Sequence, residues 1–248
     1  SKDHVVFGHN RLSIIGLENG NQPLFNKDNT LALICNGEIY NYLELKAELE
    51  KEGVQFHTES DCEVILYLYE KMGTAFLSKL RGMFAFCLWD EANQHLLIAR
   101  DRLGKKPLYY ARGAKGIAIS SEIKAITHHF LSSFTINAFE VTNALKYSHP
   151  LDKLKTVVNE VDKVQPGEYV IFKGDSVTKK VYWSINDIQK KSEHNSFKDT
   201  LNVLQTAVDI RLRSDVPVAI LLSSGIDSCS VAALAKHCRD EVHAITVG

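Results

Sequence analysis

The chain has 248 residues and a mass of 27.8 kDa, a length that fits either one large domain or two ordinary ones. Its 45% hydrophobic and 24% charged residues are typical of a folded globular protein and exclude disordered and collagen-like classes. Because 29 Lys and Arg residues nearly balance 30 Asp and Glu residues, no charge surplus draws the chain to nucleic acid or to an anionic membrane.

Cysteine usage and the start of the chain favour a cytoplasmic protein. Five cysteines, an odd number without paired spacing, indicate a reducing compartment rather than a disulfide framework. The sequence does not begin with a basic segment followed by an apolar run, and it has no apolar stretch of membrane-spanning length. We therefore expect no membrane partner and no nucleic-acid partner, and the histidines lack the spacing of zinc ligands.

The first three quarters of the chain predict an α+β domain with largely antiparallel sheets. Helical periodicity predicts helices over 42–52, where Gly53 ends the helix, and over 60–73, where Ser60 and Glu63 form a capping box. A helical connection is expected over 137–147. Apolar runs bounded by turn residues predict extended segments at 4–7, 12–15, 31–34, 83–89, 95–100, 116–120, 167–172 and 180–183.

The composition changes after Trp183, and the polar stretch 184–196 is a candidate linker. Beyond it we expect a helix over 197–212 capped by Ser196, a strand over 216–222, a second helix, and a strand over 242–247. These elements form one βαβ unit. Because the strand 216–222 is apolar at every position, it predicts a parallel sheet covered on both faces.

The loop 223–228 joins that strand to the start of a helix, a position that favours bound anions. Ser223 and Ser228 offer hydroxyl donors, Gly225 can adopt backbone angles denied to other residues, and Asp227 is a candidate Mg²⁺ ligand. An ordinary strand-to-helix turn with a capped helix explains the same residues equally well.

A second candidate site follows the strand that starts at residue 31. Asn36 and Gly37 place a side-chain amide beside a backbone N–H, which are the donors that stabilise an oxyanion in carboxamide hydrolysis. A turn that needs Asn and Gly for their backbone angles is the structural alternative. Arg11 and Asp61, taken alone, are equally well explained as a solvated charge and as an acidic residue in the first turn of a helix.

Together, these segments resemble a known family. Leu222 to Ser228 resembles the pyrophosphate loop of the ATP-pyrophosphatase enzymes, usually Ser-Gly-Gly-x-Asp-Ser, with Ser224 in place of a glycine. Val247 resembles the valine of the second strand in the asparagine synthetase branch. The segments that resemble glutamine-hydrolysing asparagine synthetase, in the same order, are 11–14, 36–41, 60–65, 82–86, 99–110 and 121–125.

The resemblance implies an Ntn-hydrolase-like glutaminase domain with stacked antiparallel sheets over 1–183, a linker over 184–196, and the start of an α/β synthetase domain over 197–248. It implies that ammonia released from glutamine passes to a site where ATP, with Mg²⁺, converts aspartate to β-aspartyl-AMP and then asparagine. These substrates would be its partners. A homodimer is compatible with the resemblance, although the residues themselves do not indicate an oligomeric state.

Site residues follow from the resemblance position by position. Asn36 and Gly37 would form the oxyanion hole, Arg11 would pair with the glutamine carboxylate, and Asp61 and Glu38 would pair with its ammonium group. The implied glutamine-binding set is Arg11, Leu12, Ser13, Ile14, Ile15, Asn36, Gly37, Glu38 and Asp61. The implied ATP-binding set is Leu222, Ser223, Ser224, Gly225, Asp227, Ser228 and Val247, with Asp227 as the Mg²⁺ ligand.

The family's nucleophile, a cysteine at the mature N-terminus, does not occur in these residues, and Cys35 is expected to be a core residue. We expect residues 1–248 alone to lack synthetase activity, because the acceptor pocket lies beyond them. Two alternatives stay open: a sister ligase, such as a β-lactam synthetase or an amidotransferase of a specialised pathway, and a non-catalytic binding module. The residue that precedes Ser1 separates a working glutaminase from the rest.

Overall fold

The computed structural model describes residues 5–148, 155–188 and 196–246. The chain divides into two compact units. Unit 1 comprises Ser1–Arg11, Gln22–Ile39 and Cys62–Asp187, and unit 2 comprises Leu12–Asn21, Tyr40–Asp61 and Ile188–Gly248. No helix in the described ranges is both long enough and apolar enough to cross a bilayer.

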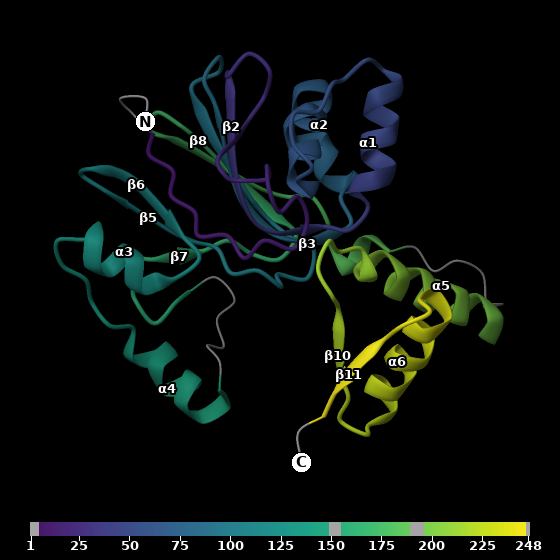
Figure 1. The fold of residues 1–248 in the computed structure, drawn as a ribbon. Coiled ribbons are helices and arrows are strands. Elements are labelled where there is room, and N and C mark those ends of the chain that lie inside the picture. Colours follow the sequence, from purple (N-terminus) through teal and green to yellow (C-terminus); the bar gives the residue numbers. More distant parts are fainter. Residues whose placement is uncertain (1–4, 149–154, 189–195, 247–248) are drawn as a thin grey trace. The chain divides into compact units, whose positions relative to one another are not determined.

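Unit 1 is built on a six-stranded antiparallel sheet (Figure 1). The apolar runs that predict strands form its centre, and the turn 91–94 closes the hairpin between β3 and β4. In spatial order the strands are β1 (Leu24–Phe25), β2 (Leu31–Ile39), β3 (Gly82–Asp90), β4 (His95–Arg100), β8 (Glu168–Lys173) and β9 (Ser176–Val181).

A second antiparallel sheet packs against the first one. It consists of β6 (Gly116–Ser120), β5 (Tyr109–Gly113) and β7 (Asp162–Lys163). The two sheets share one buried cluster, in which the rings of Tyr110 and Phe172 meet edge to face with their centroids 5.3 Å apart. The predicted α+β fold with stacked antiparallel sheets is therefore confirmed. The buried members of the cluster are Ala85, Cys87, Ile98, Leu108, Tyr110, Val164, Val170 and Phe172.

Helices complete unit 1. The helix α2 (Val64–Met72) is almost wholly buried and packs near β2, and the Phe76 ring that follows it lies 6.1 Å from the ring of Phe86 on β3. As predicted, the helix ends at a glycine, Gly73, with φ of 53°. Two further helices, α3 (Ile123–His129) and α4 (Ala138–Tyr147), lie between β6 and β7 in the chain, and Asn137 caps α4 through its side chain.

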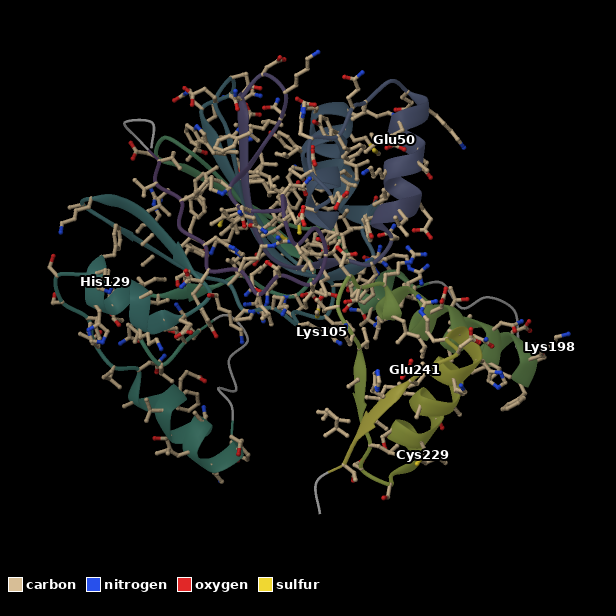
Figure 2. All side chains as sticks on the ribbon, viewed as in Figure 1. Glu50, Lys105, His129, Lys198, Cys229 and Glu241 are labelled. Atoms are coloured by element: carbon tan, nitrogen blue, oxygen red, sulfur yellow. The ribbon has the colours of Figure 1, made fainter. Side chains whose placement is uncertain are left out.

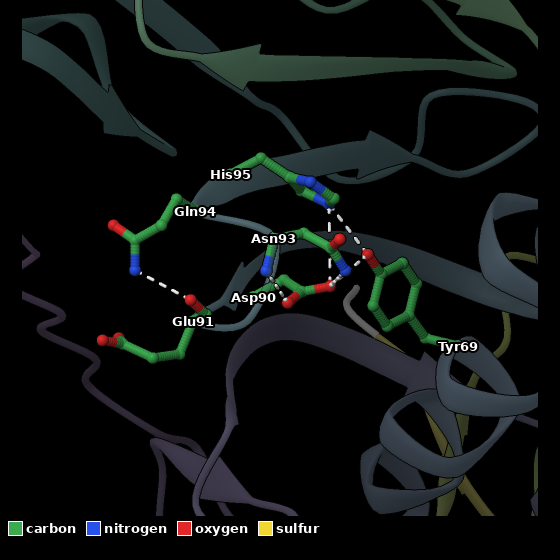
Figure 3. Close-up of polar contacts among 6 residues, drawn as sticks. All are labelled: Tyr69, Asp90, Glu91, Asn93, Gln94 and His95. Atoms are coloured by element: carbon green, nitrogen blue, oxygen red, sulfur yellow. Dashed lines mark hydrogen bonds and ion pairs between the residues drawn. The ribbon is translucent and has the colours of Figure 1, made fainter.

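A partly buried polar network connects α2 to the turn between β3 and β4 (Figure 3). The Tyr69 hydroxyl lies 2.8 Å from Asp90 Oδ2 and 2.8 Å from His95 Nε2. Asp90 also accepts hydrogen bonds from the backbone and side chain of Asn93. Burial alone would raise the pKa of Asp90, but the hydrogen bonds from Asn93 and Tyr69 outweigh it and hold the pKa below its ordinary value.

The same network predicts a loss of stability in acid. Burial lowers the pKa of His95, only partly opposed by the charge of Asp90. A histidine with a lowered native pKa binds its proton more readily when unfolded, so stability falls as the pH drops below about 6.5, the ordinary histidine value. Asp90 extends the same trend below about 3.9. Measured by urea unfolding, His95→Gln should weaken the slope of stability between pH 7 and 5.

The matched control is His128→Gln, which alters an exposed histidine on α3 and should leave the slope as it is in the parent chain. An unchanged slope in His95→Gln would contradict the role given to this network.

Unit 2 contains the predicted βαβ unit. The helix α5 (Phe197–Asp209) begins with the capping box of Ser196 and Asp199 and continues as a 3-10 turn to Leu212. The strand β10 (Ala219–Leu221), the helix α6 (Ile226–Cys238) and the parallel strand β11 (His243–Ile245) follow. Cys229 is exposed on α6 (Figure 2). The helix α1 (Tyr42–Lys51) also belongs to this unit, as does the segment 12–21.

Several local predictions are wrong. The segment 12–15 is not a strand, because Ile14 and Ile15 lie in a bend and the two residues before them have no regular structure; within the described part of 4–7 only Val5 forms a bridge. The helix α2 starts at Val64 rather than near residue 60, because a 3-10 turn over Asp61–Glu63 precedes it. The strands β10 and β11 are not covered on both faces in the described residues, where Leu221 is 75% exposed and Ile245 51% exposed.

Candidate functional site

Asn36, Gly37 and Glu38 lie together at the end of β2 in unit 1. In the β2–β3 register they pair, in that order, with Ala85, Phe84 and Met83 of β3. Residues 36–38 are half-buried. The predicted oxyanion donors are therefore held in a central pair of strands rather than in a free turn, which fixes their positions. Arg11 is half-buried in the same unit.

Gly37 is required by the close approach of β3. A Cβ atom at this position would lie 2.0 Å from the carbonyl oxygen of Met83 and 2.6 Å from the Cα atom of Phe84. Across the ladder, a Cβ at Gly82 would lie 2.2 Å from the carbonyl oxygen of Glu38. The glycine therefore has a steric reason that is independent of any role of its N–H group in chemistry.

A pocket of about 140 Å³ opens beside Asn36 in unit 1. His9, Ser120 and Ser121 contribute polar groups to its wall, and Ala85 and Leu108 contribute apolar ones. Burial lowers the pKa of His9, and the charge of Arg11 lowers it further, against a hydrogen bond to the Cys35 backbone that raises it. The imidazole is therefore a neutral polar group near Asn36 at neutral pH. The sequence does not single out His9, apart from its position two residues before Arg11.

The cysteines near this pocket are structural. The backbone of Cys35 exchanges two hydrogen bonds with the Gln22 side chain, at 2.6 Å and 3.0 Å, and Cys35 is 2% exposed. Burial raises the pKa of Cys87 to about 12, so its sulfur stays a protonated thiol at neutral pH. All five cysteines are free of disulfides. The prediction that Cys35 is a core residue is confirmed.

In unit 2, the segment 12–16, which we call the 12–16 loop, lies against the residues that precede Asp61. A Cβ atom at Gly16 would lie 2.8 Å from the backbone of Glu59 and Ser60, and Gly16 has φ of 66°. Asp61 is 4% exposed and begins the 3-10 turn before α2. Four members of the predicted glutamine set, Leu12, Ser13, Ile14 and Ile15, thus share a unit with Asp61; Leu12 is 87% exposed and Ile15 is buried.

The loop 223–228 joins β10 to α6 as predicted. The hydroxyl groups of Ser223 and Ser228 lie 3.1 Å apart, and Ser228 donates a hydrogen bond to the carbonyl of Gly225 at 3.1 Å. The first N–H groups of a helix have no acceptor within the helix, so the start of α6 can receive an anion. Leu222 extends the strand pair by donating its N–H to the carbonyl of Ile245. Val247 lies outside the described residues.

The prediction that Gly225 uses backbone angles denied to other residues is wrong. Gly225 has φ of −76°, an angle open to any residue, and the left-handed residue is Ser224, with φ of 61°. A serine side chain disfavours this conformation, so the backbone of the loop is strained at Ser224. The pyrophosphate loop of the ATP-pyrophosphatase enzymes, which this loop resembles, usually has glycine at that position. A Cβ at Gly225 would meet only Ser223 Oγ, at 3.5 Å.

Ser224→Gly should stabilise the chain by about 0.5–1 kcal/mol, because glycine adopts a positive φ without the steric cost that serine bears. The unfolding midpoint in urea, at unchanged m-value, measures the effect. Gly225→Ala is the matched control: its angle and surroundings accept a Cβ, so it should change stability by less than about 0.5 kcal/mol. A destabilised Ser224→Gly would contradict this account of the loop.

Asp227, in the first turn of α6, is exposed. Among the residues that the structure describes, no group of three His, Cys, Asp or Glu side chains is placed to hold a metal ion. Mg²⁺ is commonly bound through one or two carboxylates together with substrate phosphates, so a single exposed carboxylate beside an anion-accepting helix start fits that mode.

Two family models match successive parts of the chain. Residues 1–183 match the family described as glutamine amidotransferase domain, and residues 199–248 match the asparagine synthase family. Asparagine synthetase [glutamine-hydrolyzing] 1 of Bacillus subtilis is 38% identical over 248 residues, which cover 99% of this chain and 39% of the relative. Amidase chry2 of Gibberella zeae is 40% identical, covering 94% of this chain and 35% of the relative.

A solved glutamine phosphoribosylpyrophosphate amidotransferase from B. subtilis aligns with 92% of this chain and 48% of its own, at 21% identity and a TM-score of 0.49. The chain spans little more than a third of the length of the curated relatives that it matches. The match over residues 1–183 covers most of the chain, and the chain therefore belongs to the glutamine amidotransferase domain family.

Proposed function

We propose that this chain is part of a carbon–nitrogen ligase of the asparagine synthetase type, which amidates aspartate with ammonia taken from glutamine and uses ATP. The observation that carries the proposal is the sequence of two matches along one chain, a glutamine amidotransferase domain followed by asparagine synthase residues. The domain limits that we propose are 1–183 for the glutaminase, 184–196 for the linker and 197–248 for the synthetase part, in a cytoplasmic protein.

In the glutaminase half, the thiol of the N-terminal cysteine that the family resemblance implies would attack the carboxamide carbon of glutamine and give a tetrahedral oxyanion. The Asn36 side-chain amide and the Gly37 N–H, fixed on β2, would donate hydrogen bonds to that oxygen. Arg11 would pair with the glutamine carboxylate, and Glu38 and Asp61 with its ammonium group. Collapse of the oxyanion would release ammonia, the nucleophile for the second half, and leave a glutamyl thioester that water would hydrolyse to glutamate.

In the synthetase half, ATP would activate the side-chain carboxylate of aspartate as β-aspartyl-AMP, and ammonia would displace AMP. The pyrophosphate would lie at the start of α6, where N–H groups of the first turn and the hydroxyl groups of Ser223 and Ser228 can donate. Leu222, Ser224, Gly225 and Val247 complete the proposed ATP set. Mg²⁺ held by Asp227 would supply positive charge to the phosphates.

An amidotransferase acting on another carboxylate is the second candidate, because a relative of comparable identity bears the name amidase. The glutamine site would be the same in both cases. The two candidates differ in the carboxylate that accepts the ammonia. An assay with glutamine and ATP in which aspartate is the only acceptor supplied therefore separates them.

The proposed oxyanion hole is tested with Asn36→Ala in the full-length natural protein. Removing one oxyanion donor typically costs a factor of about 10²–10³ in kcat, so glutamine-dependent product formation should fall by that much. Product formation from added ammonium chloride bypasses the glutaminase and should stay at the parent rate. Full glutamine-dependent turnover in Asn36→Ala would contradict the assignment, and an equal fall with ammonium would show that the substitution acts through folding.

A further inference from the structure

Asp215, which lies shortly before β10 in the chain, makes two hydrogen bonds with the 12–16 loop. Its carboxylate oxygen Oδ2 accepts a hydrogen bond from the Gly16 N–H at 2.7 Å. Its own backbone N–H donates to the carbonyl oxygen of Ile14 at 3.0 Å. All three residues belong to unit 2, although residues 199 apart in sequence form the first contact. A charged acceptor at 2.7 Å is among the stronger hydrogen bonds found in proteins.

Arg213, two residues earlier, makes hydrogen bonds with Tyr40 and with Glu44 of α1. Its guanidinium group makes a two-pronged contact with the Glu44 carboxylate on α1, at 2.5 Å and 2.6 Å. It also donates to the carbonyl oxygen of Tyr40 at 2.8 Å, and its side chain is only 18% exposed. Arg211 adds a cation–π contact, with its guanidinium carbon 4.7 Å from the centroid of the Tyr40 ring. A paired fork of this kind fixes orientation as well as distance.

The 12–16 loop and the residues that follow it, up to Asn19, also contact Glu59 and Ser60, which precede Asp61. Asn19 Oδ1 accepts a hydrogen bond from the Glu59 N–H at 2.9 Å, and Gly16 packs against the backbone of Glu59 and Ser60. Burial raises the pKa of Tyr42, and the nearby carboxylates of Asp215 and Asp61 raise it further. Tyr42 therefore lies in the field of both acids, and the 12–16 loop has fixed supports on two sides.

We propose that Arg213 and Asp215 are positioning residues for glutamine. They act through the 12–16 loop, which contains four residues of the proposed glutamine site, and through Tyr40 and α1. The inference rests on the proposed function, because glutamine binding by the 12–16 loop is part of that function. The two residues lie in the part of the chain that matches the asparagine synthase family and precede the 223–228 loop, so residues of one family match support the substrate loop of the other.

The contact itself is tested by hydrogen exchange of the Gly16 amide in the full-length natural protein. Asp215→Ala removes the acceptor, so exchange in peptides covering residues 12–21 should become about three- to tenfold faster. Asp215→Asn keeps an oxygen acceptor and should exchange nearly as the parent does. Asp240→Ala, which alters an exposed aspartate of the same unit, is the matched control and should change nothing in these peptides. Unchanged exchange in Asp215→Ala would overturn the proposal.

The positioning role is tested by kinetics of the same variants. The KM for glutamine should rise about three- to tenfold in Asp215→Ala, with kcat at saturating glutamine within about twofold of the parent. The Asn variant should restore the KM, and the rate with ammonium chloride should be the same in all variants. A fall in the ammonium-dependent rate of Asp215→Ala, or an unchanged KM, would overturn it. If the parent protein does not hydrolyse glutamine at all, the proposed function fails, while the exchange result still decides the contact.

Discussion

Replacing Gly37 by alanine is expected to destabilise the chain by about 3 kcal/mol or more. The added Cβ atom would lie 2.0 Å from the carbonyl oxygen of Met83, and the nearby atoms belong to backbone that is locked in the ladder between β2 and β3. Neither strand can move away without breaking the hydrogen bonds of a central strand pair. Urea unfolding followed by circular dichroism measures the change.

Gly8→Ala is the control for this prediction, because nothing lies within 4 Å of a Cβ at that position. It should change the free energy of unfolding by less than about 0.5 kcal/mol. If Gly37→Ala proves as stable as Gly8→Ala, the close approach of β2 and β3 is wrong. The prediction also bears on function: loss of glutaminase activity on changing Gly37 cannot be assigned to the oxyanion hole, so Asn36 is the residue to test.

Replacing Asp101 by alanine has the second large expected effect, a loss of about 3–5 kcal/mol. Asp101 is 1% exposed, and its carboxylate accepts four backbone hydrogen bonds. Alanine would leave those N–H groups without their acceptor in the protein interior. The four donors are the backbone N–H groups of Phe84, Leu103, Lys105 and Lys106, at 3.0–3.2 Å.

Asp101→Asn should fall between the parent and the alanine variant, because its amide oxygen still accepts while its amide nitrogen faces other donors. Asp175→Ala removes a fully exposed carboxylate and should change stability by less than about 0.5 kcal/mol. Equal unfolding midpoints for Asp101→Ala and Asp175→Ala would show that the carboxylate does not organise this loop.

The neighbouring Arg100, at the end of β4, binds carbonyl groups of the loop that follows Asp101. Its guanidinium group donates to the carbonyl oxygens of Lys106, Val164 and Gly104 at 2.6–2.9 Å, and burial lowers its pKa. One buried anion thus binds the N–H groups of the loop and one buried cation binds its carbonyls. The segment 99–110, which carries part of the family resemblance, is explained here by the folding of unit 1 alone.

Much of the fold could be predicted because its signals are local. The apolar run from Leu31 forms β2, the polar turn after Asp90 closes a hairpin, and Ser196 caps α5 as its spacing with Asp199 allows. The positive φ in the 223–228 loop occurs at Ser224, where the sequence does not indicate it, since glycine is the residue that usually adopts such an angle. The apolar residues of segment 12–15 match the pattern of a strand, although the structure has no strand there.

The features that could not be predicted depend on residues far apart in the chain. Nothing local indicates that Met83 comes within 2.0 Å of a Cβ at Gly37, because that distance is set by the register of β2 and β3. Asp215 looks like an ordinary loop aspartate until its contact with Gly16 is seen. The sequence indicates the residue types of the candidate site and their order along the chain, whereas the contacts that hold those residues in place depend on the folded structure.

The central claim is tested most directly by supplying the full-length natural protein with ATP, Mg²⁺, aspartate and glutamine labelled with ¹⁵N in the side-chain amide. The account predicts asparagine that carries the label in its side-chain amide, with one AMP and one pyrophosphate released for each asparagine formed. Cleavage of ATP to ADP and phosphate, or label appearing in free ammonia without amidation of aspartate, would contradict it.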